Sequence, residues 1–155
     1  MLFARTLIVA VAVVTTSGAV LADLVIPGLA AQHAFNPRWP PHAKFHDAQY
    51  MVMTVLLGLI GLVLALRRGP GSLGRLLGAA AVLAVPWVGM LAAPLFPGTA
   101  AYDPEFADRT VFVLGLHGQL FLALVLITTL LAAVALALGA LPPRRGRAGT
   151  DLTAP

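Results

Sequence analysis

Cysteine is absent from the 155 residues of this chain. Its absence excludes disulfides, zinc–thiolate sites, iron–sulfur clusters and thiol catalysis. Charged residues are also scarce: they make up 10% of the chain, against about 25% in average globular proteins. Hydrophobic residues make up 59%, and the mean hydropathy is +0.92. So few polar groups cannot cover a soluble surface, so we expect a lipid bilayer to surround most of the chain.

The basic balance of the chain does not indicate a nucleic-acid partner. The formal net charge is +4 and the calculated isoelectric point is about 10.7. The basic residues do not form a stripe; they lie at the ends of apolar runs. That placement is typical of residues that orient membrane spans.

Four apolar runs are long enough to cross a bilayer core, which requires about 20 residues. Helical segments of this kind predict an all-α fold, a bundle of four transmembrane helices in a single membrane domain over residues 1–141. Residues 142–155 are expected to be a disordered cytoplasmic tail. The fourth run is longer than a span needs, so we expect it to be tilted or to protrude. The four predicted spans are residues 7–29, 48–66, 73–95 and 110–141.

The first span has an alternative interpretation as a cleaved signal peptide. Arg5 would form the basic region, residues 7–14 the apolar region and residues 20–22 the cleavage site, which would leave Asp23 at the new N-terminus. A retained helix is favoured because the apolar stretch continues beyond Asp23 to Pro27.

Basic residues in the loops predict the orientation of the bundle. Seven of them would lie on one side of the membrane and three on the other, so both termini are expected in the cytoplasm of a multi-pass protein of the inner (plasma) membrane. The first group is Arg5, Arg67, Arg68, Arg75, Arg144, Arg145 and Arg147, and the second is Arg38, Lys44 and Arg109.

Groups capable of chemistry gather between the first two spans. The segment HAFNPRWPPHAKFHDAQY, residues 33–50, holds three of the four histidines. Polar clusters beside membrane spans are the default site hypothesis. The third loop, expected on the same side of the membrane, adds Asp103, Glu105 and Asp108. We therefore predict an outward-facing pocket rich in histidine and acidic residues.

The prolines of this segment predict that the second helix begins near Pro41. His42 and His46 then lie four residues apart on the same helical face, and Tyr50 continues the stripe. Two such imidazoles can share a metal ion, with zinc, copper or iron as candidates. Interfacial histidines bonded to loop carbonyls are the alternative.

Two further polar residues lie within apolar stretches. His117 is predicted well inside the fourth span, where an unsatisfied polar group costs several kcal/mol and needs a partner. Asp23 lies late in the first span; it either reaches water or faces His46 or His117 across the bundle. A carboxylate beside an imidazole raises the histidine pKa and orients its tautomer, which suits acid–base chemistry.

The length, the four spans and the polar loop containing NPRWPPHAKFH resemble uncharacterised bacterial membrane proteins of the DoxX-like kind, and more remotely the EXPERA group. The resemblance concerns architecture over about 140 residues and assigns no residue roles. It implies a lipophilic small molecule held within the bundle between polar groups.

Three hypotheses follow. The first is binding or transformation of a lipophilic small molecule by acid–base chemistry, with His46 or His117 as the proton carrier and Asp23 or Asp47 orienting it. The second is a metal site on His42 and His46. The third is a membrane subunit without chemistry that assembles through Gly and Ala faces, with itself or with a partner. Further residues expected to line the pocket are His33, Asn36, Trp39, His42, Tyr50, Glu105 and Gln119.

Overall fold

Four long helices make up most of the molecule. The computed structural model describes residues 1–140, so the predicted cytoplasmic tail lies outside the described residues. Helix α1 spans Leu2–Val20 and continues as a π-helical turn, η1, over Leu21–Val25; α3 spans Pro41–Leu66, α4 spans Ser72–Ala92 and α5 spans Gly118–Gly139. Each is long and apolar enough to cross a membrane. The predicted all-α bundle of four membrane helices is confirmed, and it indicates a multi-pass membrane protein.

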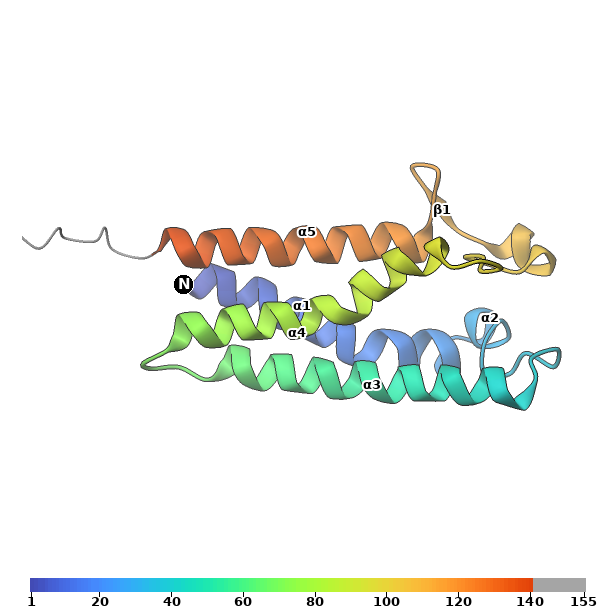
Figure 1. Cartoon of the computed structure of the whole chain (residues 1–155), viewed down its shortest axis with the longest axis horizontal. Helices are drawn as coiled ribbons and strands as arrows, with labels where there is room; N and C mark the ends of the chain where they lie inside the picture. The colour runs from blue at the N-terminus through green and yellow to red at the C-terminus, as the bar shows by residue number, and fades with distance from the viewer. Residues whose placement is uncertain (141–155) are drawn as a thin grey trace, which may run out of the picture.

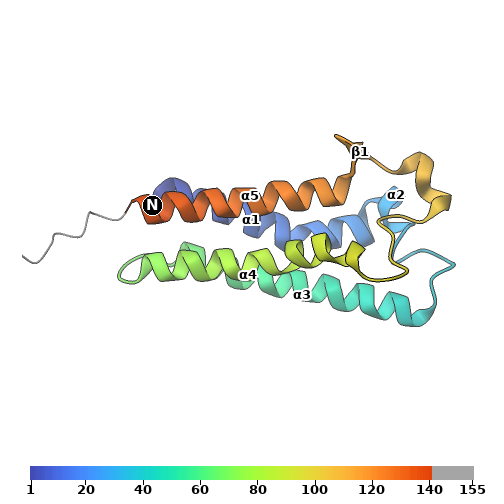
Figure 2. The ribbon, with the colours of Figure 1, turned by 45° about the horizontal axis from the view of Figure 1, so that its top comes forward.

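The short elements lie together at one end of the bundle. Figures 1 and 2 show the N-terminus and the end of α5 at the opposite end. We call the end that holds the short elements the loop end. Its elements are α2 (Pro27–Ala30), the 3-10 turns η2 (Ala93–Leu95) and η3 (Pro104–Arg109), and a two-stranded antiparallel hairpin of β1 (Phe112–Val113) and β2 (Leu116–His117).

Helix α1 packs against all three other long helices, and small residues set how closely they approach. A Cβ atom added to Gly58 would lie 2.7 Å from the Thr16 nitrogen and 2.8 Å from its Cα. A Cβ on Gly61 would lie 2.5 Å from Cγ of Leu83. Gly58 and Gly61 therefore allow α3 to approach its neighbouring helices closely. Small residues serve this purpose in membranes because hydrophobicity does not drive helices together there.

A buried hydrogen bond fixes the centre of the bundle. Nε1 of Trp87 donates to Oγ1 of Thr15 at 3.0 Å, and both side chains are buried. Trp87 is therefore a packing residue and not an interfacial anchor. The preceding residue, Pro86, lies inside α4, and Figure 1 shows that α4 bends partway along its length. Proline causes such bends because it lacks an N–H and its ring clashes with the preceding turn.

Arginine marks the end of the bundle opposite the loop end. Nη1 of Arg5 donates to the carbonyl oxygen of Ala65 and, at 3.1 Å, to that of Arg67. These carbonyls end α3, where a cation is stabilising because helix C-termini carry partial negative charge. Arg5 and the Arg67–Arg75 connection thus lie at the same end, as the orientation argument requires.

The beginning of the fourth span differs from the prediction. The expected span began near Thr110, but α5 begins at Gly118 and the preceding residues form the hairpin. Leu114 and Gly115 at its tip have φ angles of +52° and +80°, which a helix cannot contain. Gly118 N–H instead donates to the Val111 carbonyl at 2.8 Å. The expectation that His117 lies well inside a helix at membrane depth is therefore wrong: it is the first residue before α5.

Candidate functional site

Asp23 is buried at the loop end because the backbone of α1 widens there. It lies in the π-helical turn η1, and only 5% of its surface is exposed. A π-helical turn adds a residue to the helix and is frequent at functional sites. The turn ends at Ile26, whose extended backbone precedes Pro27, since proline disfavours helix in the residue before it.

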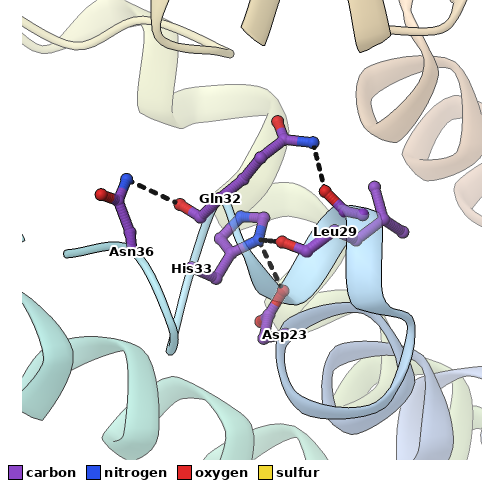
Figure 3. A network of polar contacts seen from close by, with 6 residues as sticks. Asp23, Leu29, Gln32, His33 and Asn36 are labelled. Carbon is purple, nitrogen blue, oxygen red and sulfur yellow. Dashed lines mark hydrogen bonds and ion pairs between the residues drawn. The ribbon is translucent and has the colours of Figure 1, made fainter. Parts of the chain in front are cut away.

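His33 is the partner of Asp23. Its Nδ1 lies 3.3 Å from Oδ1 of Asp23 and 2.9 Å from the carbonyl oxygen of Leu29 (Figure 3). A carbonyl oxygen can only accept, so Nδ1 of His33 must carry the proton. His33 therefore lies in the tautomer whose Nε2 has a free lone pair. The carboxylate beside Nδ1 would stabilise the imidazolium that forms when Nε2 takes up a proton.

The loop that follows His33 is held by its own side chains. Asn36 is 1% exposed; its Oδ1 accepts from the backbone N–H of Arg38 at 2.9 Å, and its Nδ2 donates to the Gln32 carbonyl at 3.4 Å (Figure 3). This is an Asx turn, in which an asparagine side chain bonds the backbone two residues further along the chain. Trp39 packs edge-on against the His33 ring, with centroids 5.7 Å apart. Asn36 and Trp39 thus position His33.

An ion pair joins the two loops at this end. Arg38 follows Asn36 in the first loop, and its guanidinium contacts the Glu105 carboxylate of η3 in the second. Glu105 was predicted to line the pocket; the structure instead uses it to connect the loops. Arg38 is largely exposed, and exposed ion pairs contribute little stability. The contact serves to position η3.

His117 caps the N-terminus of α5. The backbone N–H of Gln119 donates to its Nδ1 at 3.3 Å, so Nδ1 carries the lone pair and a neutral ring holds its proton on Nε2. Burial lowers the pKa of His117 below its usual 6.5, and the charge of His33 lowers it further. Its ring stacks on Tyr102 at 6.0 Å and meets Phe112 edge-on at 6.1 Å.

His33 and His117 line one cleft, which we call the loop-end cleft. Its volume is about 550 Å³, within the range of about 300–1,000 Å³ typical of small-molecule sites. Deduced from their hydrogen-bond partners, the two rings offer complementary atoms: Nε2 of His33 can accept, and Nε2–H of His117 can donate. The other polar or aromatic side chains that line the cleft are Gln32, Trp39, Thr99, Tyr102, Asp103, Phe106, Arg109, Thr110 and Gln119.

His42 and His46 do not belong to this cleft. Helix α3 begins at Pro41, as predicted, and their Nε2 atoms lie 3.1 Å apart. Nδ1 of His46 also lies 3.2 Å from Oε1 of Gln49. Both histidines are exposed and neither lines the cleft. Within residues 1–140, no group of three or more His, Asp or Glu side chains is placed to hold a metal ion.

The remaining predicted residues divide between the cleft and its surroundings. Gln119 lines the cleft. Asp47 is partly buried, and its negative charge repels that of Asp23. Its Oδ2 has no hydrogen-bond partner among the described residues. Tyr50 lines a separate groove between α3 and α4.

Sequence reasoning missed Tyr102 and Arg109 as cleft residues. The AYDPEFADR segment carried one usable signal, a tyrosine among acidic residues in the loop already assigned to this side. Asp23 was expected against His46 or His117, and the structure pairs it with His33 instead.

These features define a multi-pass membrane protein built as a bundle of four long apolar helices, with a cleft at its loop end. A family model matches residues 7–148, and the chain belongs to that family, the family of unknown function DUF6640. Searches of the curated proteins and of the solved structures return no match. The family description does not mention the DoxX-like proteins, so that resemblance stays an expectation.

Proposed function

We propose that this protein binds a lipophilic small molecule in the loop-end cleft and that His33 exchanges a proton with it. The observation that carries the proposal is the contact of the buried Asp23 carboxyl with Nδ1 of His33, at 3.3 Å. It leaves Nε2 of a cleft-lining imidazole free to accept a proton. The sequence favoured His46 or His117 as the proton carrier; the geometry favours His33.

Three properties of the site support binding as well as proton exchange. The cleft lies at the end of apolar helices, so a molecule dissolved in the bilayer can reach it. His117 supplies a donor, since its Nδ1 is occupied by Gln119 N–H. Trp39, Tyr102 and Phe106 supply apolar ring faces. Few convergent polar groups on apolar walls are typical of ligand sites. The DoxX-like resemblance would imply the same class of ligand.

The basic residues support an orientation for the cleft. Arg5 and the Arg67–Arg75 connection lie at the opposite end, and basic loops stay in the cytoplasm. We therefore infer that the cleft opens on the outer side of the inner (plasma) membrane and that the N-terminus is cytoplasmic. The other three arginines of that count, Arg144, Arg145 and Arg147, lie outside the described residues.

Co-purification tests the binding. Wild type and single variants are extracted with the surrounding bilayer in polymer discs, and their bound small molecules are quantified by mass spectrometry. His33→Ala and His117→Ala are expected to retain about tenfold less of one species, since each loses a hydrogen bond and its apolar contacts. His42→Ala is the matched control because it removes an imidazole outside the cleft. Equal retention by all four proteins would contradict the proposal.

Nitrogen NMR tests the proton assignment. In protein labelled with ¹⁵N-histidine, the neutral His33 ring should show a protonated Nδ1 and the His117 ring a protonated Nε2. Loss of one signal set in His33→Ala and the other in His117→Ala assigns the resonances. The opposite tautomers would remove His33 as the proton acceptor.

The histidine pair of α3 supports a second candidate function, metal binding. Two bonds of about 2.0–2.1 Å would join nitrogens 3.1 Å apart at an angle of about 100°, close to the tetrahedral preference of zinc. Water or a second molecule would have to complete the ligand set. Elemental analysis after incubation with zinc, copper or iron tests this candidate. A metal content of about one ion per chain in wild type that is lost in His46→Ala would support it. Equal metal in both proteins would rule it out.

A further inference from the structure

A second cavity lies beside the loop-end cleft, between α3 and the bent part of α4. Its volume is about 400 Å³, and we call it the α3/α4 groove. Pro86 lies in the wall of this groove, so the groove is located where α4 bends (Figure 1). Its lining residues are Tyr50, Met53, Thr54 and Leu57 from α3, with Val85, Pro86, Gly89, Met90 and Ala93 from α4 and η2.

The groove offers almost no hydrogen-bonding group. The Thr54 hydroxyl donates to its own helix, at the Met51 carbonyl, over 2.9 Å. The Tyr50 hydroxyl is the other polar side-chain group in the wall. Met53 is 47% exposed and Val85 54%, and both belong to helices that can span the membrane. The groove therefore opens sideways to the hydrocarbon of the bilayer and suits an alkyl chain.

The groove and the cleft are neighbours in the structure. Met90 and Ala93 line both of them. A molecule with a chain in the groove can thus place its head group in the cleft without leaving the protein. From Tyr50 to Leu57 the groove follows α3 over seven helical rises of 1.5 Å, about 10 Å, or roughly a third of the hydrocarbon core.

We propose that the ligand of this protein is a single-chain amphiphile whose alkyl chain lies in the α3/α4 groove and whose uncharged, hydrogen-bonding head lies in the loop-end cleft. The inference rests on the function proposed for the cleft. An uncharged head, such as a hydroxyl, matches the acceptor on His33 and the donor on His117. The small volume of the groove, about 400 Å³, favours one chain over the two chains of a phospholipid.

Glycines of α4 provide a variant and a matched control. A Cβ added to Gly89, which lines the groove, meets no atom within 4 Å, and the same is true of Gly74 near the other end of α4. Gly89→Leu should therefore fill the groove without disturbing the packing. Gly74→Leu makes the same change at a residue that lines neither the groove nor the cleft. Val85→Trp on the exposed rim is a second filling variant, and unfolding midpoints verify that each variant is folded.

Photocrosslinking in phospholipid nanodiscs tests the proposal, with a diazirine-bearing long-chain alcohol as the probe and peptide mapping as the readout. Wild type and Gly74→Leu should be labelled at Met53, Leu57 and Met90. Gly89→Leu and Val85→Trp should lose about tenfold of that labelling. His33→Ala should raise the probe concentration needed for half-maximal labelling.

Two results would overturn the inference. Labelling spread evenly over the lipid-facing surfaces of all four helices would show annular contact only, and unchanged labelling in both filling variants would exclude the groove. A third result separates the two proposals. Groove labelling that is lost in Gly89→Leu but unchanged in His33→Ala would refute the function proposed for the cleft, and with it the placement of the head group, while the chain site stands.

Discussion

The contact between Asp23 and His33 can be measured by a double-mutant cycle of Asp23→Leu and His33→Phe. The two partners are not equivalent. The Asp23 side chain is 7% exposed and receives its hydrogen bond from His33. The His33 side chain is 23% exposed and also donates to the Leu29 carbonyl. Removing His33 leaves a buried carboxyl without a partner, while removing Asp23 leaves His33 with one hydrogen bond.

This asymmetry sets the expected magnitudes. His33→Phe should lower the free energy of unfolding by about 2–3 kcal/mol, the cost of leaving a buried acidic group unsatisfied. Asp23→Leu should change it by less than about 1 kcal/mol, because the desolvation of the carboxyl is removed together with the contact. The double variant should resemble Asp23→Leu, so the coupling energy should match the cost of His33→Phe, about 2–3 kcal/mol in magnitude.

Unfolding by SDS in mixed micelles, followed by circular dichroism at pH 7, provides the assay. Asn36→Ala, which loosens the loop without touching the carboxyl, controls for general damage at the loop end. Costs that are equal and additive for the two single variants would refute the reasoning, because they would show that Asp23 does not depend on His33.

Three further predictions concern the helix crossing, the hairpin and the cap. Gly58→Ala should destabilise the bundle by about 1–3 kcal/mol in SDS unfolding, because its Cβ would lie 2.8 Å from Cα of Thr16; the control Gly74→Ala should be neutral or stabilising. Leu114→Asn should raise the thermal midpoint by relieving about 1 kcal/mol of strain at a φ of +52°, and an unchanged midpoint would contradict this. The folded-state pKa of His117 is lowered from 6.5, so its contribution to the free energy of unfolding is fully present above pH 6.5 and is lost as the pH falls, because the unfolded chain takes up the proton first. His117→Gln should reduce this pH dependence in unfolding measured from pH 7 to pH 5.

Composition and the lengths of the apolar runs were enough to assign the class of the molecule. Apolar runs of membrane length and a 10% share of charged residues indicate membrane-spanning helices. Helices are expected because only they satisfy their backbone hydrogen bonds within a single segment in lipid. The start of α3 at Pro41 and the adjacency of His42 and His46 followed from proline chemistry and the helical repeat. Both depend on interactions over a few residues, which a sequence displays directly.

Which polar groups meet depends on how the helices and loops pack in three dimensions. The pairing of Asp23 with His33 depends on a π-helical turn, and no local sequence pattern predicted that turn. The position of His117 depends on a hairpin with a left-handed leucine at its tip, against the apolar character that favoured a continuous helix. The histidines nearest to one another in the sequence pattern lie outside the cleft, and those in the cleft come from different loops. Side chains converge through the path of the backbone between them, and that path is set by packing across the bundle.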